Sequence, residues 1–197
     1  MNEPGLLTFL VFLPLAGALA IVSLIRNPKA ARSFAVAVTL ADLLLAAIAY
    51  VSYDPGKPGL QLEEKFTWIA PLNVQYFLGL DGLNAPMALL TALLGLCAVL
   101  ASWKIQVRVR EYFAWLLVLQ TAVMGVFVAM DFVLFFVFWE LELVPMYFLI
   151  SVWGTGRKEY SAMKFVAFTI LGSAFMLVAI LLLYFSTGTF DMTSLPA

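Results

Sequence analysis

Two glutamates lie where a charged group is costly. Glu140 and Glu142 belong to the stretch FVFWELELVPMYF, residues 135–147, among large apolar and aromatic side chains. Pro145 follows Glu140 within about one and a half helical turns. A carboxyl group in such surroundings can bind and release a proton. An ionisable side chain inside a membrane costs at least about 2.5 kcal/mol and is a functional candidate by default.

The composition places these residues in a membrane. Of the 197 residues, 64% are hydrophobic and only 12% are charged, whereas a soluble domain carries about 25% charged residues. The first apolar run, 6–25, is long enough to span a bilayer and is followed by no small-residue cleavage site. We therefore expect an integral membrane protein that retains its first helix.

Cofactor chemistry is not expected in this chain. It contains no histidine and one cysteine, Cys97, which excludes the common ligand sets for haem, copper, zinc and iron–sulfur centres. It has no Gly-x-Gly-x-x-Gly or Walker sequence for a nucleotide. We predict no cofactor-binding residues and no metal site, so redox or nucleotide chemistry would belong to other subunits.

Six membrane-spanning helices are predicted. A bilayer core about 30 Å thick needs about 20 apolar helical residues. The apolar stretch 112–153 would be about 63 Å long as one helix, so it must turn back, and Asp131 is the expected turn. The resulting all-α membrane domain covers 1–197, with helices at about 6–25, 33–51, 83–102, 112–130, 132–153 and 162–185.

The basic residues predict the orientation. Eight of the 11 lysines and arginines lie in the connections 26–32, 104–110 and 157–158, and such connections face the cytoplasm. Both termini should therefore lie on the outer, periplasmic side of a bacterial plasma membrane. In the outer loop 52–82, β-prone residues flank Ala70-Pro71-Leu72, which predicts a short β-hairpin.

Helical geometry separates the two glutamates. Glu140 lies about 12 Å below the outer edge, near the bilayer centre, and Glu142 is about 200° further around the helix. Pro145 has no N–H for the carbonyl of Leu141, so we predict a bend near 141–145 that would let water reach Glu140. Glu140 is the main candidate for proton transfer, and Glu142 is a weaker one.

Two other polar residues lie inside predicted spans. Lys164 is one turn inside the last helix, so it is either an interfacial lysine that reaches toward water or a participant in proton uptake. Asp42 lies in the middle of the second helix, among alanines and leucines. It could form a hydrogen bond between helices, contact another subunit or take part in transport.

Several stretches resemble one family. FWELELVPMYFLISVWG (138–154), GRKEYSAMKF (156–165), TGTFDMTSL (187–195) and YFLGLDGLNAPMALLTALL (76–94) resemble subunit M of proton-pumping NADH:quinone oxidoreductase, respiratory complex I. The resemblance implies an antiporter-like fold in which Glu140 transfers protons with a lysine on a later, broken helix. It also places Lys164 at a position that is polar or basic in relatives, and Glu142 at one that is often apolar.

The resemblance also implies partners. Family members continue well beyond the position of Ala197, so we expect this chain to be the first part of the fold, as a fragment or half of a split subunit. NADH, FMN, iron–sulfur clusters and quinone are expected on other subunits, and the partners would be other membrane-arm subunits and the lipid bilayer, with no nucleic acid. The alternative is a subunit of a multisubunit sodium/proton antiporter or of a membrane-bound hydrogenase.

Overall fold

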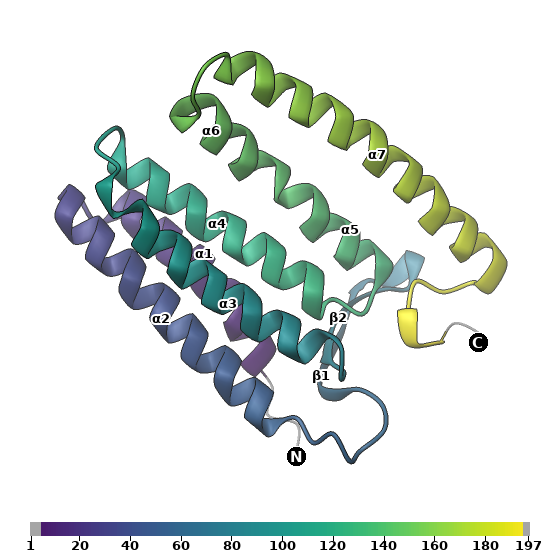
Figure 1. Ribbon diagram of the computed structural model, residues 1–197. Coiled ribbons are helices and arrows are strands. Elements are labelled where there is room, and N and C mark those ends of the chain that lie inside the picture. The colour runs from purple at the N-terminus through teal and green to yellow at the C-terminus, as the bar shows by residue number, and fades with distance from the viewer. Residues whose placement is uncertain (1–4, 195–197) are drawn as a thin grey trace.

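Six long apolar helical segments lie side by side in the computed structural model, which describes residues 5–194 (Figure 1). Each segment is long and apolar enough to cross a membrane. The predicted all-α membrane fold with six spans is confirmed. The segments are α1 (Leu6–Ser23), α2 (Pro28–Ser52), α3 (Asn84–Ala101), α4 (Val109–Val128), α5 (Phe132–Leu141) continued by α6 (Leu143–Trp153), and α7 (Lys158–Thr187).

Several helices extend beyond the apolar stretches from which they were predicted. The second begins at Pro28 instead of 33, because Asn27 accepts a hydrogen bond from the Lys29 N–H and Pro28 occupies the first turn. The last spans Lys158–Thr187 instead of 162–185. Hydropathy detects only the part of a helix that lies in hydrocarbon, whereas the headgroup region accommodates further polar helical turns.

The bundle has a compact part and an open edge. α1 packs against α2 and α4, and α3 packs against α2 and α4, while α5 and α6 lie along α4. α7 packs mainly against α6, with smaller contacts to α5. Large side chains on α7 are exposed, including Phe168, Phe175 and Phe185. This edge presents a surface suited to lipid or to another membrane helix.

The predicted β-hairpin is present at the end of the bundle that also holds the described ends of the chain (Figure 1). Strands β1 (Gln61–Ile69) and β2 (Val74–Leu80) pair antiparallel, and Ala70–Leu72 forms a 3₁₀ turn between them. Asn73 closes this turn at a φ of 52°, in the left-handed region that asparagine tolerates.

Hydrogen bonds tie the segment after α7 back to the bundle at the end that holds the hairpin. The Phe132 N–H donates to the carbonyl of Phe190 at 2.9 Å, and the Met192 N–H donates to the carbonyl of Met130 at 3.0 Å. Lys65 of β1 pairs with Asp191 at 2.7 Å. At the opposite end of α7, the Lys158 ammonium donates to the carbonyl of Val152 at 2.6 Å.

Glu64 of β1 caps the N-terminus of α1, although the two are far apart in the sequence. Its carboxylate accepts hydrogen bonds from the N–H groups of Gly5, Leu7 and Thr8 at 2.7–3.1 Å and from the Thr8 hydroxyl. The N–H groups at the start of a helix have no partners within it, and the helix dipole favours a negative charge there. Glu64 is 3% exposed, so this carboxylate joins the hairpin firmly to α1.

We expect Glu64→Ala to lower the thermal stability of the purified protein. The substitution leaves buried donors of α1 without an acceptor, at about 1–3 kcal/mol for each such group. Glu63→Ala is the matched control, since Glu63 is exposed on the same strand and a surface change costs at most about 0.5 kcal/mol. Equal melting temperatures for the two variants would contradict the capping role.

Candidate functional site

The helical hydrogen-bonding pattern is interrupted at Glu142. α5 ends at Leu141 and α6 begins at Leu143, inside the interval where the sequence predicted a disturbance. Pro145 lacks the N–H that would bond the carbonyl of Leu141, which accounts for the break. A backbone acceptor is thereby left free close to Glu140, near the middle of the span.

Glu140 lies in a cavity between the last two spans. This α6–α7 pocket has a volume of about 410 Å³ and is lined by Glu140, Leu143, Val144, Tyr147, Phe148, Val166 and Ile170. The Glu140 Oε1 atom is buried and has no hydrogen-bond partner within the described residues. A carboxyl group with an unused oxygen in an apolar pocket is suited to holding a proton.

Glu142 does not line this pocket. It is half-buried, and the rotation of about 200° between the two positions places it on a different side of the helix. Glu142 is the residue between α5 and α6, and its side chain forms no capping hydrogen bond to α6.

Lys164 does not lie beside Glu140 in the structure. Its side chain is exposed on α7, and its ammonium lies 4.6 Å from the centre of the Tyr160 ring. The α7 residues of the pocket are Val166 and Ile170, and across residues 5–194 no ion pair links Lys164 with Glu140. A role for Lys164 in proton uptake therefore remains a prediction.

Asp42 has a partner that the sequence analysis missed. The Gln120 side-chain N–H donates to Asp42 Oδ2 at 2.5 Å, and Asp42 is fully buried. The contact joins α2 to α4 within the chain and does not face a neighbouring subunit. Gln120 is the one glutamine inside a predicted span, which is a signal that could have suggested it as the partner.

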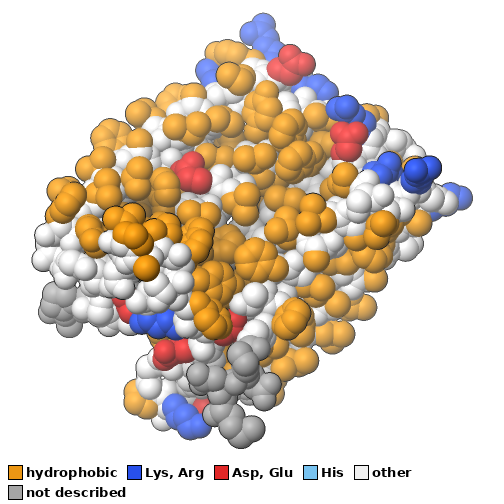
Figure 2. Space-filling view, turned by 180° about the vertical axis from the view of Figure 1, so that it is seen from behind, with side chains coloured by type: hydrophobic (Ala, Val, Ile, Leu, Met, Phe, Trp, Pro, Cys, Tyr) orange, Lys and Arg blue, Asp and Glu red, His pale blue; other side chains and the backbone are white. Residues whose placement is uncertain are grey.

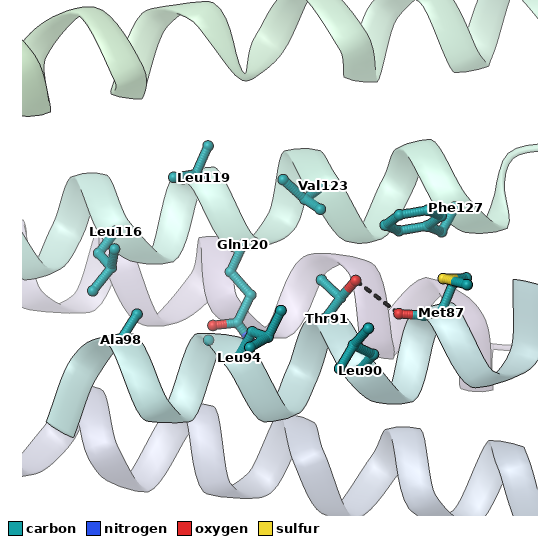
Figure 3. Close-up of a pocket in the computed structure, with 11 residues that line it drawn as sticks. Met87, Leu90, Thr91, Leu94, Ala98, Leu116, Leu119, Gln120, Val123 and Phe127 are labelled. Carbon is teal, nitrogen blue, oxygen red and sulfur yellow. Dashed lines mark hydrogen bonds between the residues drawn. The ribbon is translucent and has the colours of Figure 1, made fainter. Parts of the chain in front are cut away.

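Gly95 makes room for this contact. A Cβ atom at Gly95 would lie 2.3 Å from Gln120 Oε1, so any other residue would collide with the amide. Figure 3 shows Gln120 extending from α4 toward α3 in a cavity of about 390 Å³, which we call the α3–α4 pocket. It lies between residues 87–98 of α3 and 116–127 of α4 and is mostly apolar.

Charge is concentrated at the ends of the molecule. Figure 2 shows hydrophobic side chains over the side of the bundle, most of the Lys and Arg side chains at one end, and a mixture of acidic and basic side chains at the other. It also shows acidic atoms in the middle of the apolar surface. In the part of the chain that the structure describes, no three His, Cys, Asp or Glu residues are grouped to hold a metal ion.

Comparison with known proteins places this arrangement in a family. Residues 129–197 match the family described as "NADH:quinone oxidoreductase/Mrp antiporter, TM". The chain is 43% identical over 167 residues to NAD(P)H-quinone oxidoreductase chain 4 2 of a Synechococcus strain, covering 83% of this chain and 31% of that protein. It is 39% identical over 196 residues to NADH-quinone oxidoreductase subunit M of Rhodobacter capsulatus, covering 97% of this chain and 38% of that protein.

A solved structure agrees with these sequence matches. Respiratory complex I from Thermus thermophilus contains a chain that superimposes with a TM-score of 0.81 at 25% identity, covering 94% of this chain and 38% of that one. The protein thus spans about a third of the length of the curated relatives it matches. With these matches to the sequence and the fold, the chain belongs to the NADH:quinone oxidoreductase/Mrp antiporter transmembrane family, as a relative of subunit M.

Proposed function

We propose that this chain is part of a proton-translocating membrane-arm subunit of an NADH:quinone oxidoreductase, in which Glu140 accepts and releases the transported proton. The observation that carries the proposal is the position of Glu140. Its carboxyl has one unpaired buried oxygen, lies beside an interrupted helix and lines the α6–α7 pocket. The family match supplies the reaction to which such a carboxyl would contribute.

The chemistry of Glu140 follows from its surroundings. The described residues that line the pocket beside Glu140 include no Lys or Arg, so in this proposal the carboxyl exchanges its proton with a water molecule or a basic group that enters the pocket. The carbonyl freed by Pro145 offers a hydrogen-bond acceptor for such a water near the carboxyl. Lys164, on the neighbouring helix, is the candidate for proton uptake from the cytoplasmic side, and Glu142 is a secondary one.

In this proposal the chain is a subunit of a translocating enzyme and carries out no redox reaction of its own. NADH, FMN, iron–sulfur clusters and quinone would bind to other subunits, and the partners would be other membrane-arm subunits. The alternative is a subunit of a multisubunit sodium/proton antiporter or a membrane-bound hydrogenase, because the matched family also covers Mrp antiporters. The matches at 43% and 39% identity to quinone oxidoreductase subunits favour the first function.

Purification from the native membrane distinguishes these functions. The protein carrying an affinity tag should be isolated in mild detergent, and its associated subunits should be identified. We expect NADH:quinone oxidoreductase subunits and inhibitor-sensitive quinone reduction in the purified complex. Recovery of antiporter or hydrogenase subunits, without quinone reductase activity, would replace the proposal by the alternative.

The proposed topology places both described ends of the chain on the outer side of a bacterial plasma membrane. Lys29→Cys and Lys104→Cys lie in basic connections and should react with a membrane-impermeant thiol reagent only from the cytoplasmic side. Lys57→Cys, in the connection between α2 and β1, should react only from outside. Cys97 is exposed on α3 and must first be replaced by serine. Labelling of Lys29→Cys from outside would show that the chain has the opposite orientation in the membrane.

A further inference from the structure

Asp42 is a second carboxyl group in the middle of the bundle. It lies ten residues before Ser52, the last residue of α2, or about 15 Å along the helix axis. Gln120 lies eight residues before the end of α4 at Val128, or about 12 Å from it. Glu140 is eight residues after the start of α5 at Phe132. Asp42 and Glu140 therefore lie at similar depths on different helices.

The contacts of Asp42 fit the neutral acid better than the carboxylate. Gln120 supplies one hydrogen bond to Oδ2, whereas Oδ1 is buried and has no partner within residues 5–194. An ionised carboxylate accepts several hydrogen bonds and is costly to bury without them. A neutral carboxyl group avoids the cost of burying an uncompensated charge at this position.

No charged group faces Asp42 to compensate a negative charge. The helices packed against α2 are α1, α3 and α4. Within their described ranges α1 and α3 contain no Asp, Glu, Lys or Arg, and Cys97 of α3 is exposed. The titratable residues of α4 are Arg110, Glu111 and Tyr112, at least eight residues, or about 12 Å, from Gln120.

Gln120 lies between Asp42 and the α3–α4 pocket. It is one of the residues that line this pocket (Figure 3), and its side-chain amide donates to Asp42. The Gln120 amide occupies the space that a side chain at position 95 would fill, so it lies directly against α3. Gln120 therefore links the Asp42 carboxyl to the α3–α4 pocket.

We propose that Asp42 is a second proton-binding carboxyl of this chain, with Gln120 as its hydrogen-bond donor and the α3–α4 pocket as the route for proton exchange. Release transfers one proton from the carboxyl to a water molecule and leaves a carboxylate, and rebinding reverses this step. An asparagine could make the same contact with Gln120, so the acid adds one property, a proton that it can release to leave a carboxylate. The site is distinct from Glu140 and does not depend on the role proposed for it.

Infrared spectroscopy of the purified native complex tests this site. We expect wild type to show a carboxylic-acid C=O band that is lost in Asp42→Asn, which preserves the shape and the contact with Gln120. Transfer to D₂O should shift this band, and Gln120→Leu should move it by removing the donor. Thr39→Val is the control, because Thr39 is buried on α2 and its hydroxyl bonds only to backbone carbonyls of α2. It should leave the band unchanged.

Two outcomes would overturn the inference. If Asp42→Asn removes no carboxylic-acid band, Asp42 is ionised and does not hold a proton. If the band is present but does not shift in D₂O during turnover, the acid is sealed and only joins α2 to α4. The measurement does not require proton pumping by this chain, so its result is separate from that of the Glu140 substitutions.

Discussion

Glu140→Gln is expected to lower the rates of proton pumping and coupled quinone reduction by about a hundredfold in the assembled complex. Loss of a positioned proton-transfer group typically lowers a rate by at least this factor. Glutamine keeps the shape and hydrogen-bonding capacity of the side chain in the α6–α7 pocket but cannot release a proton. In a tightly coupled enzyme the redox reaction also stops when a transfer step is blocked. Pumping is measured with a pH-sensitive dye in vesicles, and quinone reduction is measured by NADH oxidation.

Two further variants sharpen this test. Glu142→Gln should cost much less, because Glu142 does not line the pocket. Glu140→Asp should retain part of the activity, because the carboxyl survives about one bond further back and a water can bridge the gap. Complex assembly must be measured for each variant, since a change at a buried charge can alter stability. Normal pumping by assembled Glu140→Gln, or a larger loss in Glu142→Gln, would contradict the relay role.

Gly125→Leu should prevent stable packing of α4 against α5. A Cβ atom at Gly125 would lie 2.3 Å from the ring of Phe138, which is 4% exposed and has little space to move. Even Gly125→Ala should cost about 1–3 kcal/mol by overpacking. The measured quantities are the amount of folded protein in the membrane and its melting temperature in detergent.

A matched pair of variants identifies the cause. Gly172→Ala on α7 places its Cβ where no atom lies within 4 Å, so it should behave as wild type. Phe138→Ala combined with Gly125→Ala should lose less stability than the sum of the losses in the two single variants, because the collision is absent once the ring is removed. If Gly125→Leu accumulates normally and melts as wild type does, the close approach of α4 and α5 is not required for the fold.

Local patterns in the sequence were sufficient for the spans and the hairpin. The lengths of the apolar stretches give the number of membrane-spanning helices, and β-prone residues around Ala70–Leu72 identify the strands. The side-chain contacts between distant elements could not be read in this way. Glu64 and Leu7 are 57 positions apart, and Asp42 and Gln120 are 78 positions apart. Periodicity within one helix contains no information about such pairs.

The same limit applies to the candidate site. The spacing of Glu140 and Glu142 predicts that they lie on different sides of their span, and in the structure Glu140 lines the α6–α7 pocket whereas Glu142 does not. The position of Lys164 depends on which side of α7 faces α6, and α7 is apolar around most of its circumference. Without an amphipathic pattern, the rotation of that helix is decided by packing alone.

Because both ends of α7 are attached, the helix is constrained like a beam clamped at its two supports. The hydrogen bond of Lys158 fixes the start of α7, and the backbone hydrogen bonds of Phe190 and Met192 fix the segment that follows its end. Between them, α7 has few contacts with elements other than α6 and α5. Such a beam bows sideways most readily near its centre instead of swinging from one end. Ile170 lies close to the centre, and Val166 lies one turn nearer to Lys158. Both residues line the pocket of Glu140, so bending of α7 would widen or narrow the space around this carboxyl.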